Sequence, residues 1–263
     1  MAKSGVAYGI LKEEGVDTTG MTPKEAWEKV NELRGKSGSQ KLKEEEIKNN
    51  TPKYNKGVTK FYNPQEQINA VKKYANNIND ERAKQQIDEY IKDIEDEPKI
   101  TEDMIQVADK VGSKLLGFDF RTKSANSFLR KISGEDGKIK DNVRYTFEIG
   151  DDIYETYSKV VENLKNMGYK EIIVKNYWNN DKKAYNGINT NFISPTGRIL
   201  EVQYHSEEGL KVKERMHKLY EEQRLLSETD PKFQEYERQM FEMSNNLHRP
   251  STVDKIVNKD MEV

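Results

Sequence analysis

The feature that most constrains the fold is a change of residue pattern after about residue 116. Before it, apolar residues recur at helical spacing within highly charged stretches. After it, short segments rich in β-forming residues alternate with helical ones. The expected strands are 142–149, 171–178, 188–194 and 199–205. The last two flank Pro195-Thr196-Gly197, a sequence typical of a hairpin turn, so they are expected to pair with each other.

Helices are expected between and after these strands. Residues 151–167 carry an apolar stripe followed by Gly168, a typical C-cap, and charged helices are expected over 209–226 and 231–245. This order of elements predicts an α+β fold, with a mixed β-sheet flanked by helices and a helical N-terminal extension. The predicted division is a helical connector and linker (1–60), a charged helical region (61–100) and a domain with C-terminal helices (101–263).

The N-terminal half is expected to be helical with breaks at defined residues. Two short helices are expected within 1–36, the second opened by Thr22-Pro23. The pattern over 64–96 is expected to break at Asn76–Asp80, and Pro98 to end that region. Thr101 then resembles the cap of a separate helix running to about residue 116.

Composition supports a compact domain with an appendage better than one core for the whole chain. Hydrophobic residues make up 34% and charged residues 34%, which is a low apolar share. The 44 Lys and Arg nearly balance the 46 Asp and Glu, so no general attraction to nucleic acid or membranes is expected. The absence of cysteine excludes disulfides and thiolate chemistry. No apolar run is long enough to span a membrane.

The first group of candidate site residues surrounds the expected helix 124–132. Lys123, Ser127 and Lys131 recur every four residues and so share one helix face, with Arg121 just before them. Cationic donors near a helix N-terminus can grip a triphosphate, and an arginine can lie over a base. Taken alone, the pattern more often indicates a solvated basic face.

Two further patterns are weak in isolation. Asp141 and Arg144 stand at the start of the strand 142–149, where a carboxylate can hold Mg²⁺ and an arginine can hold phosphate. The loop from Tyr185 to Asn189 offers a tyrosine that can stack on a base. Structural alternatives are a surface ion pair for the first and a tight turn for the second.

The most specific local pattern is Glu201-Val-Gln203-Tyr-His205. Because side chains alternate along a strand, Glu201, Gln203 and His205 are expected on one face and the two apolar residues on the other. Polar groups on a central strand are costly to bury, which favours a functional role over a structural one. A carboxylate at this place can act as a general base or a metal ligand.

In this order, the four patterns resemble the synthetase domain of the RelA/SpoT (alarmone synthetase) family. That family reads R-x-K-x-x-x-S-x-x-x-K, then Asp and Arg on a strand, then a tyrosine loop, then E-x-Q. The resemblance covers about residues 101–226. It implies that the chain is an enzyme, an ATP:nucleotide pyrophosphotransferase, which moves pyrophosphate from ATP to a ribose hydroxyl of a purine nucleotide. The products would be of the (p)ppGpp or (p)ppApp type, and tRNA is a further acceptor to be tested.

The resemblance also implies roles for the residues. ATP binding falls to Arg121, Lys123, Ser127 and Lys131, and catalysis to Glu201, Asp141 and Arg144. Mg²⁺ is expected on Asp141 and Glu201. Acceptor binding falls to Tyr185, Asn189, Gln203 and His205.

Two departures from the family pattern bear on these roles. Asp141 and Arg144 stand as D-x-x-R where the family usually has D-x-x-G-x-R. The tyrosine loop ends in Gly187-Ile188-Asn189 where the family usually has Ser-Leu-His or a similar sequence. The first concerns the metal role of Asp141 and the second the choice of acceptor.

No His-Asp cluster of the family's hydrolase domain is visible, and the chain has only 3 histidines. Synthesis without hydrolysis is expected to harm a cell, which suggests a toxin acting in the cytoplasm of a host or target cell, with an immunity protein as partner. The segment from Tyr8 to Glu25 resembles, less specifically, phage minor head proteins of the MuF type, which implies an association with the phage head and transport in the virion. An ordinary helical hairpin is the alternative for that segment.

Two other functions stay open at this point. One is a phosphotransferase of the same fold that moves only the γ-phosphate to a nucleotide or a tRNA end. The other is a non-catalytic, capsid-associated module that binds nucleotide without turnover.

Overall fold

The computed structural model describes residues 11–12, 14–21, 25, 29, 63–132, 139–180 and 182–260. The chain divides into two compact units, Met1–Lys53 and Tyr54–Val263. The helices and linker expected within 1–60, and the segment that resembles phage head proteins, lie largely outside the described residues. All structural findings below concern the second unit.

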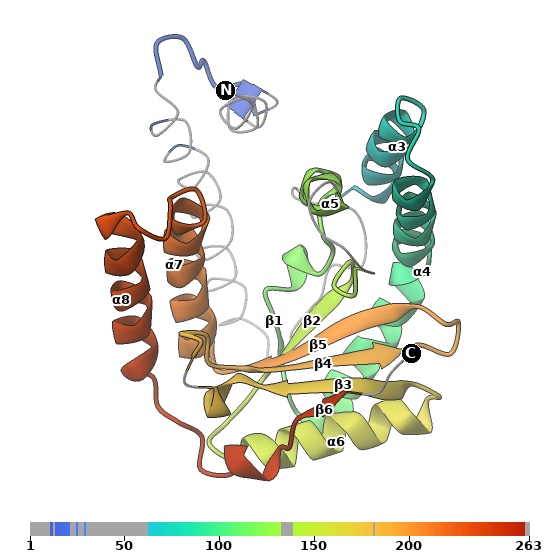
Figure 1. The fold of residues 1–263 in the computed structure, drawn as a ribbon. Coiled ribbons are helices and arrows are strands. Elements are labelled where there is room, and N and C mark those ends of the chain that lie inside the picture. Colours follow the sequence, from blue (N-terminus) through green and yellow to red (C-terminus); the bar gives the residue numbers. More distant parts are fainter. Residues whose placement is uncertain are drawn as a thin grey trace. The chain divides into compact units, whose positions relative to one another are not determined.

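A six-stranded mixed sheet forms the centre of this unit, and helices flank it (Figure 1). The strands lie in the order β1-β2-β5-β4-β3-β6, with β2 and β5 parallel and the other pairs antiparallel. Their bounds are β1 Leu115–Leu116, β2 Arg144–Glu148, β3 Lys170–Asn176, β4 Ile188–Ile193, β5 Ile199–His205 and β6 Lys259–Asp260. The predicted α+β fold, its four strands and its hairpin are therefore confirmed, and β1 and β6 are two short edge strands that the sequence patterns did not reveal.

One face of the sheet carries the main hydrophobic core. Phe147, Val202 and Tyr204 from the central strands are buried there. They pack with Met104 of helix α4 (Glu81–Val111) and Leu164 of helix α6 (Ile153–Asn166). Gly168 follows α6 with a φ of 89°, the left-handed conformation expected of a C-cap glycine. With this face filled by α4 and α6, the alternating polar residues of the same strands point to the opposite face.

Helix α4 corrects the expected break at Pro98. The break at Asn76–Asp80 is present between α3 (Pro64–Ala75) and α4, but α4 then runs through Pro98 as one helix of 31 residues. Thr101 is not a cap, because its hydroxyl bonds to Glu97 one turn earlier and to the Tyr145 hydroxyl at 2.7 Å. Apolar residues are buried on both sides of the proline, and this packing outweighs the local cost of proline within a helix. The predicted domain boundary at residue 100 falls inside α4.

A second, smaller core fixes the helix that follows Lys123. Val71 of α3, Ile87 and Tyr90 of α4, and Phe128 of α5 (Ala125–Ile132) are buried together. The Tyr90 and Phe128 rings stack with centroids 4.3 Å apart. The Tyr90 hydroxyl also donates to the Lys123 carbonyl oxygen at 2.7 Å. The backbone that enters α5 is thus tied to α4.

The chain continues from β5 into two helices. These are α7 (Glu207–Gln223) and α8 (Pro231–Asn245), which pack against each other through a small core with Val212, Met216 and Met240. Helices α5 and α7 lie on the opposite side of the sheet from α6 (Figure 1). After α8 the chain returns to pair β6 with β3. None of the helices described in the structure combines the length and apolar character that crossing a membrane requires.

Candidate active site

Polar side chains of three neighbouring strands share the face of the sheet opposite the main core. Glu201 of β5 pairs in register with Arg144 of β2 and Asn191 of β4, and Gln203 pairs with Asn189. The intervening residues of β5 belong to the main core. The predicted placement of Glu201, Gln203 and His205 on one face is therefore confirmed, because residues two apart on a strand point the same way.

The Glu201 carboxylate is the centre of this face. Its Oε1 accepts a hydrogen bond from Asn189 Nδ2 at 3.1 Å, and its Oε2 accepts one from Gln203 Nε2 at 2.7 Å. Burial raises the pKa of Glu201 above its ordinary value, and Asp141 adds to this, although the nearby cation Arg144 opposes it. Two amide donors orient a carboxylate that is more basic than an exposed one, which suits a general base.

The predicted ATP-binding lysines meet at Asp141. Lys123 Nζ lies 2.7 Å from one Asp141 carboxylate oxygen, and Lys131 Nζ lies 3.4 Å from the other. Burial alone would raise the pKa of Asp141, but Lys123, Lys131 and Arg144 together lower it below its ordinary value. Ser127 is half-buried on α5, where its hydroxyl accepts from Ser124 Oγ at 3.0 Å. The structure thus brings Lys123, Lys131 and Asp141 together at the start of β2.

Arg121 lies apart from these lysines. Its side chain is 1% exposed, and its Nε donates to Glu97 Oε1 at 2.6 Å. Its guanidinium carbon lies 4.6 Å from the centre of the Phe118 ring. The arrangement is that of a buried ion pair with Glu97 of α4, and the expected contact of Arg121 with ATP stays a prediction.

The tyrosine loop reaches Glu201 through Asn189. The Tyr185 hydroxyl donates to Asn189 Oδ1 at 2.7 Å and lies 2.6 Å from His205 Nε2. Since a hydroxyl has one proton and gives it to Asn189, His205 must donate to Tyr185 from Nε2. Burial, together with the Lys213 charge, holds the pKa of His205 well below its ordinary value, which agrees with a neutral imidazole.

The approach of Tyr185 and His205 depends on Gly187. A Cβ atom at Gly187 would lie 2.5 Å from His205 Cε1 and 2.6 Å from the Tyr185 hydroxyl oxygen. These separations are shorter than any ordinary van der Waals contact. The glycine of this loop is therefore needed for the side chains to pack where they do, not only for a turn.

Lys213 of α7 is a candidate site residue that the sequence patterns above did not include. Its Nζ donates to Gln203 Oε1 at 2.5 Å and lies 5.8 Å from the centre of the Tyr185 ring. Burial lowers the pKa of Lys213 to about 7, and Arg144 contributes to the lowering. A signal was present, since Lys213 interrupts the stripe Gly209, Val212 and Met216, all of which are buried in α7. A lysine within a buried stripe is a candidate site residue.

The charges on this face favour an anionic ligand. Lys123, Lys131, Arg144 and Lys213 outnumber the two carboxylates of Asp141 and Glu201. Within the part of the chain that the structure describes, the Arg144 guanidinium forms no ion pair. Cations that protein carboxylates do not neutralise are suited to binding phosphate groups.

The same face could hold a magnesium ion if water and substrate phosphates supplied the remaining ligands. Searching the described residues finds no cluster of three or more His, Cys, Asp or Glu that could hold a metal ion. Asp141 and Glu201 are close enough for the charge of one to raise the pKa of the other. Mg²⁺ commonly binds through one or two carboxylates and completes its shell with water and substrate phosphates, so these two residues fit it.

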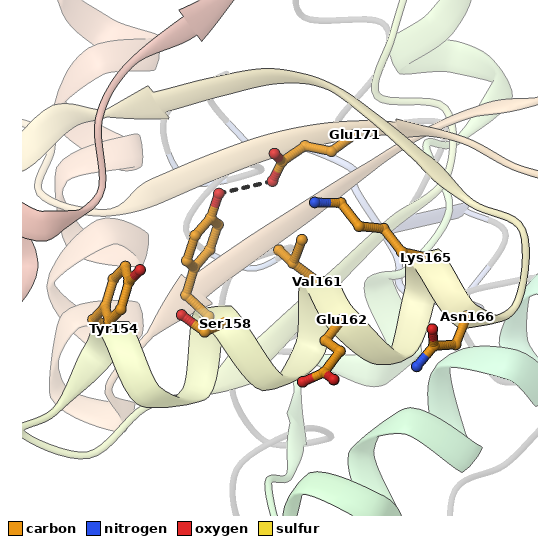
Figure 2. Close-up of a pocket in the computed structure, with 8 residues that line it drawn as sticks. Tyr154, Ser158, Val161, Glu162, Lys165, Asn166 and Glu171 are labelled. Atoms are coloured by element: carbon orange, nitrogen blue, oxygen red, sulfur yellow. Dashed lines mark hydrogen bonds between the residues drawn. The ribbon is translucent and has the colours of Figure 1, made fainter.

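A cavity of about 380 Å³ lies away from this site, along α6 (Figure 2). It is lined by α6 residues and by Glu171, which accepts a hydrogen bond from the Tyr157 hydroxyl at 2.8 Å. None of the candidate site residues lines it. The polar face of the sheet therefore remains the candidate active site.

The solved structures that are similar to this chain include the following two. The first is a complex between the type VI effector Tas1 and its immunity protein, with 22% identity, a TM-score of 0.43, and coverage of 64% of this chain and 95% of that one. The second is the small alarmone synthetase 2 from Bacillus subtilis, with 19% identity, a TM-score of 0.41, and coverage of 55% of this chain and 82% of that one. No family model and no curated protein matches the chain.

Proposed function

We propose that this chain transfers the pyrophosphate group of ATP to a ribose hydroxyl of a purine nucleotide. The observation that carries the proposal is Glu201, a basic carboxylate oriented by Asn189 and Gln203 on a sheet face with excess positive charge. The four sequence patterns that resemble the RelA/SpoT synthetase family all contribute residues to this unit. A general base beside a phosphate-binding surface is what attack by a sugar hydroxyl on a phosphate requires.

The reaction exchanges one P–O bond for another. The acceptor's ribose hydroxyl gives its proton to Glu201, and its oxygen forms a bond to the β-phosphorus of ATP. The bond between that phosphorus and the oxygen bridging to the α-phosphate breaks, so that AMP leaves. Lys123, Lys131 and Arg144 stabilise the negative charge that develops on the transferred group.

Donor binding requires a change of partners at Asp141. Lys123 and Lys131 are bound to its carboxylate, and the triphosphate of ATP would compete for the same ammonium groups. Asp141 is then available with Glu201 to hold Mg²⁺, which supplies neutralisation of phosphate charge when bound. Ser127 is expected to donate to the same triphosphate. Arg121 would have to leave Glu97 to take its expected place over the base.

The acceptor is expected at the Tyr185 side of Glu201. Tyr185 offers an aromatic ring, and Asn189, Gln203 and His205 surround the carboxylate that takes the hydroxyl proton. Guanine nucleotides, adenine nucleotides and the 3′ end of tRNA all carry a ribose hydroxyl suited to this chemistry. An acceptor panel is therefore part of the test.

The test is product analysis with the full chain. The protein is incubated with ATP and Mg²⁺ together with GDP, GTP, ADP or tRNA, and the nucleotides are separated by ion-exchange chromatography. AMP and a pyrophosphorylated acceptor are expected. ADP in place of AMP would show transfer of the γ-phosphate alone, and ATP binding without consumption would show a non-catalytic module.

The matched variants for this test are Glu201→Gln and Glu208→Gln. Glu201→Gln removes the base but keeps the shape, so a loss of about 10²–10⁴-fold in turnover is expected. Glu208 is an exposed glutamate in the first turn of α7, and its substitution should leave turnover unchanged. Equal activity of Glu201→Gln and the wild-type chain would overturn the assignment of the base.

Unopposed synthesis also predicts toxicity. Expression of the chain should arrest growth, and Glu201→Gln should relieve the arrest. An immunity protein, action in the cytoplasm of a target cell and carriage in a phage head are further expectations from the sequence resemblances. Growth assays with a co-expressed neighbouring gene product would test the first of these.

A further inference from the structure

The side-chain amides of Asn189 and Gln203, which bond to Glu201, each accept a further hydrogen bond from another residue. Asn189 Oδ1 accepts from the Tyr185 hydroxyl at 2.7 Å, and Gln203 Oε1 accepts from Lys213 Nζ at 2.5 Å. Each amide thus has its oxygen bonded to an outer donor and its NH₂ group bonded to Glu201. Two chains of hydrogen bonds thus end on the carboxylate, one at each of its oxygens.

Lys213 and Glu201 together fix which end of the Gln203 amide faces the carboxylate. An ammonium group has three donors and no acceptor, so only the amide oxygen can bond to Lys213. The NH₂ end must then point at Glu201, which as a carboxylate can only accept. Glu201 favours the same orientation, so loss of Lys213 removes one of the two groups that hold the amide and takes away the donor of its oxygen.

We infer that Lys213 is a positioning residue for the reaction. By fixing the Gln203 amide, it keeps the NH₂ donor on Glu201 and holds that carboxylate in the orientation of a base. This inference rests on the proposed function for its chemistry, but the orientation of the Gln203 amide is a property of the protein alone.

The surroundings of Lys213 make a buried ammonium group unfavourable at this position. It is half-buried and faces Glu201 and His205 of β5, Arg144 of β2 and Tyr185, and its own helix adds Glu214 and His217. Its only hydrogen bond among the described residues is to the neutral amide of Gln203. Burying an ammonium group beside an arginine without a carboxylate at bonding distance destabilises the fold, so packing alone does not account for it.

A spectroscopic experiment tests the orientation without any need for turnover. The side-chain amide signals of Gln203 are recorded in ¹H–¹⁵N spectra of the ligand-free chain and of Lys213→Met, Lys213→Arg and Lys218→Met. The Gln203 signals should shift in Lys213→Met and return toward their original position in Lys213→Arg, which keeps the donor. Lys218 is an exposed lysine of the same helix, so Lys218→Met should leave them unchanged.

Kinetics then separate positioning from substrate binding. Lys213→Met is expected to lower kcat by about 10–100-fold, the usual effect of removing a partner behind a site residue, with little change in KM. Gln203→Leu should cause a similar loss. The double variant should be no less active than either single variant, because each substitution interrupts the same chain of hydrogen bonds from Lys213 through Gln203 to Glu201. Circular dichroism confirms that each variant is folded.

Each result bears on one inference only. Unchanged Gln203 signals in folded Lys213→Met would overturn the role of Lys213, whatever the activity. A raised KM with additive losses would also overturn it, since that is the behaviour of a direct contact with substrate phosphate. Absence of AMP from the wild-type chain would count against the proposed function, while the spectra would still decide whether Lys213 orients Gln203.

Discussion

Replacing Lys213 by methionine should stabilise the fold, and the gain should depend on pH in a defined way. Burial lowers the pKa of Lys213 from 10.5 to about 7 in the folded chain. At about 1.4 kcal/mol for each pH unit, this corresponds to an upper limit of roughly 5 kcal/mol of destabilisation. Methionine has a similar stem without the charge, so the variant escapes this cost.

The direction of this pH dependence follows from the number of protons that the folded and the unfolded chain bind. Below pH 7 the lysine is charged in both folded and unfolded chains, and the full destabilisation is present. Between about 7 and 10.5 the unfolded chain binds one proton more than the folded one, so wild-type stability rises with pH relative to the variant. The advantage of Lys213→Met should therefore shrink by about 1.4 kcal/mol for each pH unit in this range.

The assay is urea unfolding of the full chain, followed by circular dichroism at pH 7.5, 8.5 and 9.5. The full slope corresponds to one proton, and the pH at which it begins marks the pKa of Lys213 in the folded chain. Lys218→Met, on the exposed side of the same helix, should show no such slope. A stability difference for Lys213→Met that is flat, or that grows with pH, would refute the reasoning.

Two further substitutions probe the support of the site. Glu97→Ala removes the carboxylate that pairs with the buried Arg121 guanidinium, so a loss of about 3–5 kcal/mol is expected in urea unfolding; wild-type stability would contradict it. Gly187→Ala places a Cβ 2.5 Å from His205 Cε1. The free energy of unfolding should therefore fall by about 1–3 kcal/mol, and AMP should form more slowly. Gly150→Ala, where a Cβ meets no atom within 4 Å, is its control, and equal melting temperatures of the two variants would contradict the close packing.

The features that could be predicted from sequence are those that depend on local periodicity. Alternation along β5 placed Glu201, Gln203 and His205 on one face, and the turn Pro195-Thr196-Gly197 paired β4 with β5. That pairing then brings Asn189 beside Gln203 without any further information. Because the period of a strand is two, the composition of each face follows from the order of residues.

The features that could not be predicted depend on packing between distant segments. The break expected at Pro98 is absent because burial on both sides of it is worth more than one backbone hydrogen bond. Arg121 belongs to a motif typical of a phosphate site, yet Glu97 on another helix holds it in the interior. Lys213 lies outside the four motifs, and although it interrupts a buried stripe of α7, its partner Gln203 follows only from the position of α7 against the sheet.

Because α4 is one unbroken helix, it links the two hydrophobic cores of this unit. Its first turns contribute Ile87 and Tyr90 to the core that carries α5, and its last turns contribute Met104 and Val107 to the core beneath the sheet. One continuous helix therefore connects the core that holds α5, with its lysines, to the core beneath the strand that carries Glu201. Amide hydrogens of α3, α5 and the sheet should therefore exchange in one cooperative opening, not as two independent folding units.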